Sequence, residues 1–188
     1  MIIWEDSYIM NTDKYRKLKI IQMGLISLAI IVNAIVIIDQ ITSSANVFDI
    51  LLGLCATATL FCGAIYLIFD YKKSMAGFYK AFVALYILSL LVRIISSLVN
   101  GASLLPTACS IVSLVALVAL EFLKDLGQDN SSKVYAVLFV SELISALRVL
   151  FAGNMSDFAK AISSLLILGT FGVMITFKYI DKKSRGSK

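Results

Sequence analysis

Six apolar runs, each about as long as a bilayer core is thick, constrain this chain more than any other feature. A helix needs about 20 apolar residues to cross a hydrocarbon core of about 30 Å. Backbone groups in lipid must bond within their own segment, so each run is predicted to be helical. Charged residues are 15% of the chain, against about a quarter in soluble domains. The sequence therefore predicts an all-α, polytopic membrane protein, with spans at about 18–38, 47–69, 79–99, 105–122, 134–152 and 158–179.

The whole chain, 1–188, is predicted to form a single integral membrane domain. Residues 1–17 are mixed in polarity and are expected to form a cytoplasmic interfacial segment, while 180–188 form a basic cytoplasmic tail. The first apolar run is longer than the 7–15 residues typical of a signal-peptide core. We therefore interpret it as a membrane span.

The distribution of basic residues predicts the orientation. Of the 17 Lys and Arg residues, all but Arg93, Arg148 and Lys160 fall at the same side of the predicted bundle. Basic loops stay in the cytoplasm, which places both termini there and requires an even number of spans. The net charge of +5 is explained by this bias and by contact with anionic lipids. No soluble domain carries a basic surface, so nucleic-acid binding is not expected.

The runs pair into three helical hairpins that resemble one another. Each hairpin starts near a basic or aromatic cluster and ends in an acidic residue beside Lys, with a spacing of about 55 residues between Asp70, Asp125 and Asp181. Such a spacing indicates an internal repeat. Asn33, Arg93 and Arg148 each lie about 14 residues into an odd-numbered run. At 1.5 Å per residue, they are expected at one level in the outer half of the membrane.

Three charged residues inside the runs, Arg93, Glu142 and Arg148, are the main candidates for a binding site, together with Asn33. A charge inside a span costs about 2.5–3.5 kcal/mol on insertion scales and indicates function by default. The arginines either extend to the outer headgroups or face inward and bind an anion through their guanidinium forks. Glu142 cannot reach water easily, and we expect Arg93 to be its partner. This pair is either structural or part of a solute or proton site.

The sequence lacks the signatures of catalysis. With no histidine, it offers no His-based zinc site, haem ligand or general base. No nucleotide-binding glycine motif is present. The three cysteines lie within apolar runs and are interpreted as packing residues. We expect a protein that is not an enzyme and that holds no metal or cofactor.

Small residues recur at helical spacing in the second run, at Cys55, Thr59 and Gly63, and again in the fourth and sixth runs. Such stripes allow helices to approach closely. They predict tight helix packing inside the bundle.

Two functions fit these features. The first is a solute-binding or transport subunit in the cell membrane, with an outward-facing, anion-binding site. In size and span number the chain is similar to the substrate-binding subunits of energy-coupling-factor transporters, a resemblance that implies a second membrane subunit and cytoplasmic ATPases as partners. Its first run departs from that family's small-residue docking face. The region reads Ile20, Met23, Gly24 and Ser27, and Gly24 and Leu28 break the alanine pattern. The second is a non-catalytic scaffold, assembly, immunity or regulatory subunit that acts through helix contacts.

Overall fold

The computed structural model describes residues 3–43, 46–69, 76–101, 104–122, 128–152 and 155–186, and the side chains of 17, 20–43, 46–69, 77–101, 104–122, 130–148, 151 and 158–174. These residues form six helices and no strand. The helices are α1 Ile3–Thr42, α2 Val47–Ile68, α3 Ala76–Val99, α4 Leu104–Phe122, α5 Gln128–Ala152 and α6 Met155–Gly186. The all-α fold predicted from the apolar runs is thus confirmed.

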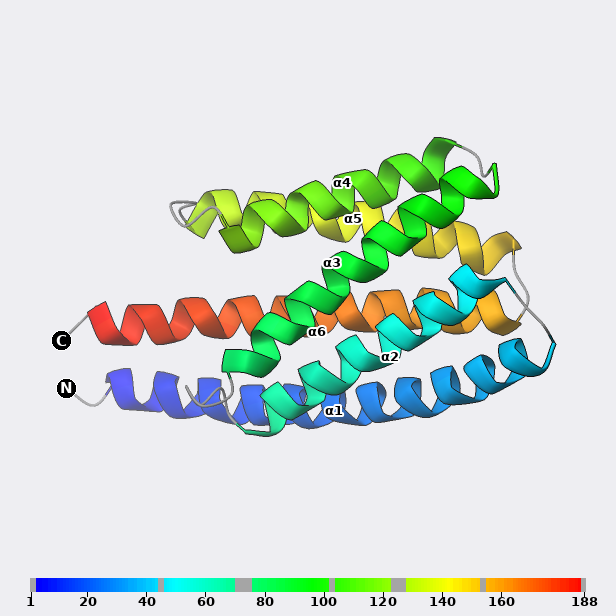
Figure 1. The fold of residues 1–188 in the computed structure, drawn as a ribbon. Coiled ribbons are helices and arrows are strands. Elements are labelled where there is room, and N and C mark those ends of the chain that lie inside the picture. The colour runs from blue at the N-terminus through cyan, green and yellow to red at the C-terminus, as the bar shows by residue number, and fades with distance from the viewer. Residues whose placement is uncertain are drawn as a thin grey trace.

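Successive helices run in alternating directions, and each packs against the next (Figure 1). The last helix, α6, also packs against α1 and α2, so the six helices form a closed bundle. The N-terminal end of α1 and the C-terminal end of α6 lie at the same end of the bundle (Figure 1). We call this the terminal end, and the opposite one the far end. Contacts between α2 and α3 are as extensive as those inside the expected hairpins, so the packing does not single out three hairpin units.

The bundle exposes many apolar side chains on its outside and buries several polar side chains within its apolar core. Exposed side chains along α1 include Ile21, Leu28 and Ile35, each about 60% exposed. Gln22 and Asn33, on the same helix, are buried. Continuous apolar exposure of this kind is typical of a membrane-facing surface and not of a soluble monomer. Among the residues that the structure describes, four helical segments are long and apolar enough to cross a bilayer: Ile20–Thr42, Val47–Ile68, Gly77–Val99 and Leu104–Phe122.

The small-residue stripe of the second run lies where it was predicted to lie, in the interior. Cys55, Thr59 and Gly63 are buried on α2. A Cβ at Gly63 would come within 2.9 Å of Thr170 on α6 and 3.1 Å of Phe82 on α3. Only glycine allows α2 to lie this close to both helices. Around this point the core packs aromatic rings, with Phe82 stacked on Phe171 at a centroid distance of 6.3 Å.

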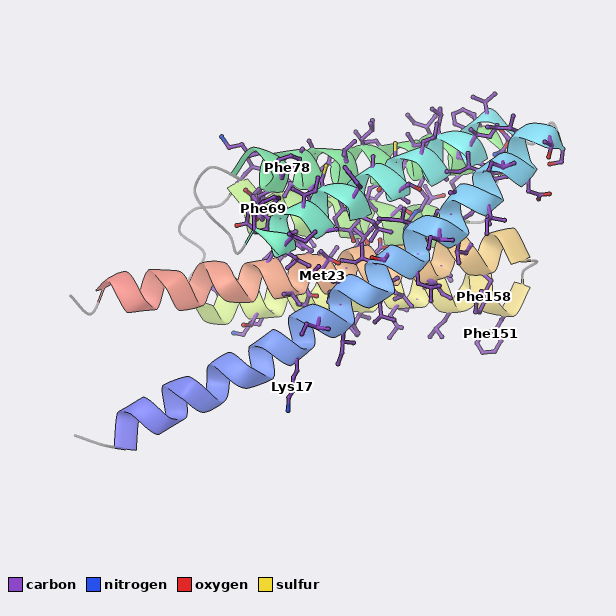
Figure 2. The ribbon with its side chains drawn as sticks, turned by 90° about the horizontal axis from the view of Figure 1, so that it is seen from below. Lys17, Met23, Phe69, Phe78, Phe151 and Phe158 are labelled. Carbon is purple, nitrogen blue, oxygen red and sulfur yellow. The ribbon has the colours of Figure 1, made fainter. Side chains whose placement is uncertain are left out.

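Helical structure continues beyond the predicted first and last spans. α1 begins at Ile3 and α6 ends at Gly186, because no proline interrupts either segment. Figure 2 shows Lys17 on the part of α1 that diverges from the other helices at the terminal end. At the far end, Asn46 caps α2 by accepting a hydrogen bond from the Phe48 amide. The turn after α3 uses Gly101 at φ +61°, a conformation that favours glycine.

Candidate functional site

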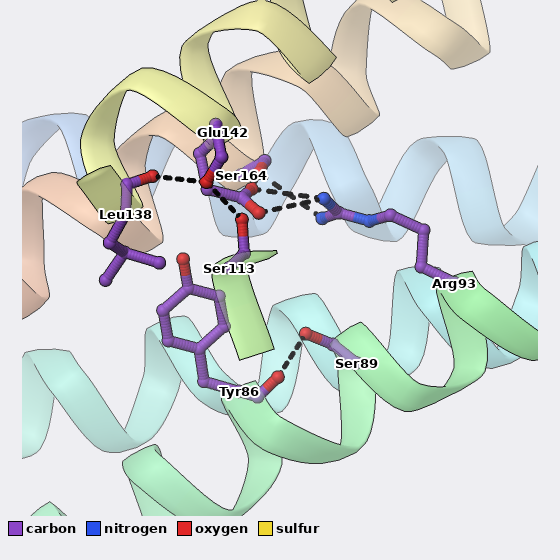
Figure 3. Close-up of polar contacts among 8 residues, drawn as sticks. Tyr86, Ser89, Arg93, Ser113, Leu138, Glu142 and Ser164 are labelled. Atoms are coloured by element: carbon purple, nitrogen blue, oxygen red, sulfur yellow. Dashed lines mark hydrogen bonds and ion pairs between the residues drawn. The ribbon is translucent and has the colours of Figure 1, made fainter. Parts of the chain in front are cut away.

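Arg93 and Glu142 form an ion pair inside the bundle, the pairing expected from the sequence. The Arg93 side chain crosses from α3 to α5, where Nη1 donates to Glu142 Oε1 at 3.2 Å and to Oε2 at 3.1 Å (Figure 3). Arg93 Nη2 donates to Ser164 Oγ on α6 at 3.3 Å. The Ser164 hydroxyl in turn donates to Glu142 Oε2. One carboxylate thus ties together three helices through charge-assisted hydrogen bonds.

The two members of this pair are buried to different degrees. The Glu142 side chain is 0% exposed, whereas 25% of the Arg93 side chain remains exposed. A buried carboxylate is tolerated only when it is paired and hydrogen-bonded. Arg93 and Ser164 together meet that requirement. Close by, Ser113 of α4 and Ser141 of α5 share a hydroxyl hydrogen bond of 2.7 Å (Figure 3), so polar contacts extend from the ion pair toward α4.

Arg93 also borders a cavity of about 150 Å³. Five helices contribute to its wall, all except α4. The lining residues are Asn33, Leu52, Gly53, Ala56, Ser89, Arg93, Ser145, Ala146, Lys160, Ala161, Ser163, Ser164 and Ile167. These positions are late in α1, α3 and α5 and early in α2 and α6, so the cavity lies toward the far end of the bundle. Its wall combines basic, amide and hydroxyl groups with aliphatic side chains.

Asn33 lines this cavity with one amide atom unpaired. The side chain is 4% exposed, and its Oδ1 accepts a hydrogen bond of 2.8 Å from Ser163. Its Nδ2 finds no hydrogen-bond partner among the described residues. A buried donor without a partner costs about 1–3 kcal/mol. Such a donor beside a cavity is a physical reason to look for a ligand.

Lys160 is a cavity residue that we did not place in the site from the sequence. Its Nζ donates to Asp49 Oδ1 on α2 at 2.8 Å, and the two side chains are 28% and 37% exposed. The sequence signal was present, since Lys160 is the one basic residue assigned to the outer loops. Its relation to Asp49 was hidden because the two are 111 residues apart in the chain.

Arg148 does not join the other candidates. Its side chain is exposed, and it is not among the residues that line the cavity. Arg148 makes no hydrogen bond or ion pair that the structure records with the described residues. Asn33 and Arg93 therefore share the cavity, Glu142 lies behind Arg93, and Arg148 is separate. The side chains described here include no cluster of three acidic or cysteine residues that could hold a metal ion.

The helical fold, the apolar exterior and the four helical segments long enough to cross a bilayer indicate a helical membrane protein with an internal ion pair and a cavity. No protein-family model, curated protein or solved structure matches the chain. The proposals that follow therefore depend on geometry and chemistry.

Proposed function

We propose that the protein is a solute-binding or transport subunit of the cell membrane. The observation that carries this proposal is the cavity, whose wall includes Arg93, Lys160 and Asn33, the last with an Nδ2 that makes no hydrogen bond to the described residues. Polar groups that converge on an otherwise apolar pocket are typical of small-molecule sites. A bundle built for packing alone would fill such a space with side chains.

The proposal includes an orientation. All six helices cross the bilayer as three hairpins of a repeat of about 55 residues, and both termini are cytoplasmic. Support comes from the basic residues near the terminal end, from the shared end of α1 and α6 (Figure 1), and from the apolar segment Phe158–Met174 in α6. Asn33 and Arg93, at matching repeat positions, border one cavity. In this orientation the cavity opens toward the outside.

The protein is proposed to be non-catalytic and to depend on partners for any energy input. Candidate partners are a second membrane subunit and a cytoplasmic ATPase, as the similarity in size to energy-coupling-factor subunits implies. The bilayer itself is the other partner, through exposed apolar side chains such as Ile35 and Val115.

A stability screen tests the proposal. The full chain in mild detergent is heated with small organic anions, cations and neutral solutes in turn, and the same is done with the Asn33→Leu variant. A solute that raises the melting temperature of the wild type and not of the variant supports the proposal, because ligands that bind only the folded state stabilise it. If no solute does so, the solute-binding function is wrong. Arg148→Gln, at an exposed residue that is not among those lining the cavity, is the matched control that must keep the response.

The second candidate function is that of a scaffold. It is favoured by an apolar groove on the outer surface of the bundle, between α4 and α5. The groove is lined by Ala108, Cys109, Val112, Ala136, Val137, Val140, Ser141 and Ile144. Small side chains on a lipid-facing groove are suited to close helix contacts. Under this function, Val137→Leu would reduce the yield of a membrane complex, and Asn33→Leu would not.

A further inference from the structure

We propose that the cavity recognises a compact monocarboxylate, with its carboxylate between Arg93, Asn33 and Lys160 and its short alkyl body against the aliphatic wall. This inference depends on the proposed solute-binding function and specifies its ligand class.

The polar part of the wall contains three residues with N–H donors, Arg93, Lys160 and Asn33, beside the hydroxyls of Ser89, Ser145, Ser163 and Ser164. Arg93 has five N–H groups, and its recorded hydrogen bonds to Glu142 and Ser164 occupy at most three of them. At least two remain for a ligand without disturbing Glu142. Asn33 offers Nδ2, since its Oδ1 is engaged by Ser163. A carboxylate accepts hydrogen bonds only and matches the planar guanidinium fork.

The charges already present favour one negative charge on the ligand. Arg93 is balanced by Glu142, and Lys160 is paired with Asp49. The two carboxylates are not part of the wall, whereas both cations are. A carboxylate in the cavity therefore lies nearer to the two cations than to their acidic partners and can accept hydrogen bonds from them. With each cation already paired, the wall carries no net positive charge to offset the burial of a second carboxylate. Dicarboxylates should be rejected for this reason.

The cavity volume limits the length of the ligand. A cavity of about 150 Å³ corresponds to a molecule of benzene size, about six non-hydrogen atoms. Leu52, Ala56, Ala161 and Ile167 supply an apolar wall for a chain of a few carbons. Butyrate has the right size and serves as the probe.

The test is equilibrium dialysis of carbon-14 butyrate against the full chain in detergent micelles, with protein-free micelles as the blank. We expect saturable binding that non-radioactive butyrate competes away. Butyramide, which has the same shape and no charge, should compete at least tenfold more weakly, as should succinate. Asn33→Leu should weaken butyrate binding at least tenfold, because a charge-assisted hydrogen bond is lost. Lys160→Gln should weaken it several-fold, and Arg148→Gln should leave it unchanged.

Three outcomes would overturn the inference, and they separate it from the proposed function. If butyramide or an amine binds more tightly than butyrate, the cavity takes a different solute class, and only the monocarboxylate is wrong. Tighter binding of butyramide or an amine would mean that Asn33 presents its oxygen, a hydrogen-bond acceptor, to the ligand. If butyrate binds equally well to Asn33→Leu and Lys160→Gln, its site lies elsewhere. If no small solute of any class binds, the proposed function fails together with its ligand.

Discussion

The ion pair between Arg93 and Glu142 predicts an asymmetric response to mutation. Arg93→Ala leaves the carboxylate of Glu142, which is 0% exposed, with the uncharged hydroxyls of Ser164 and Ser113 as its recorded partners. Glu142→Gln leaves an arginine whose side chain is 25% exposed and borders the cavity, where water can solvate it. The first change should therefore destabilise the protein much more than the second.

The magnitudes follow from the burial of each partner. Leaving one member of a buried ion pair uncompensated costs about 3–5 kcal/mol, which we assign to Arg93→Ala. Glu142→Gln keeps the side-chain shape and weakens the charge-assisted hydrogen bonds that Arg93 and Ser164 donate, so we expect a cost of about 1–2 kcal/mol. In the double variant no buried charge is left. Its cost should be at least about 2 kcal/mol below the sum of the single changes.

The assay is the free energy of unfolding in mild detergent, followed by circular dichroism as a denaturing detergent is added. Arg148→Ala is the matched control, because this arginine is exposed and its loss should change stability by no more than about 0.5 kcal/mol. Equal costs for Arg93→Ala and Glu142→Gln would refute the reasoning, and so would additive costs in the double variant.

Three further predictions use the same unfolding assay. Gly63→Ala should destabilise the protein by about 1–3 kcal/mol through overpacking against α3 and α6. Gly24→Ala is the control, because Gly24 has open space around it, and it should be neutral or slightly stabilising. Equal effects of the two changes would contradict the close approach of α2 to α3 and α6. Lys160→Gln should cost less than about 1 kcal/mol, because its ion pair is partly exposed, and a larger loss would assign Lys160 a structural role. Asn33→Leu should not lower stability, since the loss of the Ser163 contact is offset by removal of an unpaired buried donor; a loss above about 2 kcal/mol would show that the amide serves packing.

The helices were predictable from the sequence because a bilayer imposes a length and a polarity on any segment that crosses it. The residues at which the helices begin and end were harder to predict. The helical continuation of α1 back to Ile3 has no apolar signal, since residues 3–17 are mixed in polarity. The pairing of Arg93 with Glu142 followed from the need of a buried carboxylate for a cation.

The depth of a residue in the membrane predicted its place in the site less well than the face of the helix on which it lies. Arg93 and Arg148 were placed at the same depth, yet Arg93 lies inside and Arg148 is exposed. Glu142 faces inward on α5, as do Ser145 and Ala146, three and four residues later. Six residues at 100° each turn Arg148 well away from that face. The contact of Lys160 with Asp49 depends on the packing of α2 against α6. No local sequence pattern shows that packing, so the place of Lys160 in the cavity wall could not be predicted.

The proposed function requires a solute-sized cavity that opens at the end of the bundle far from the termini. The most direct test introduces cysteine at Ser145, which lines the cavity, or at its neighbour Ile144, which lines the outer groove. Cys55, Cys62 and Cys109 are first replaced by alanine, and a small, charged, membrane-impermeant thiol reagent is added to intact cells. We predict that Ser145→Cys reacts from outside while Ile144→Cys, in the apolar groove, does not. Reaction of neither, or reaction of Ser145→Cys only after the cells are broken open, would contradict the account.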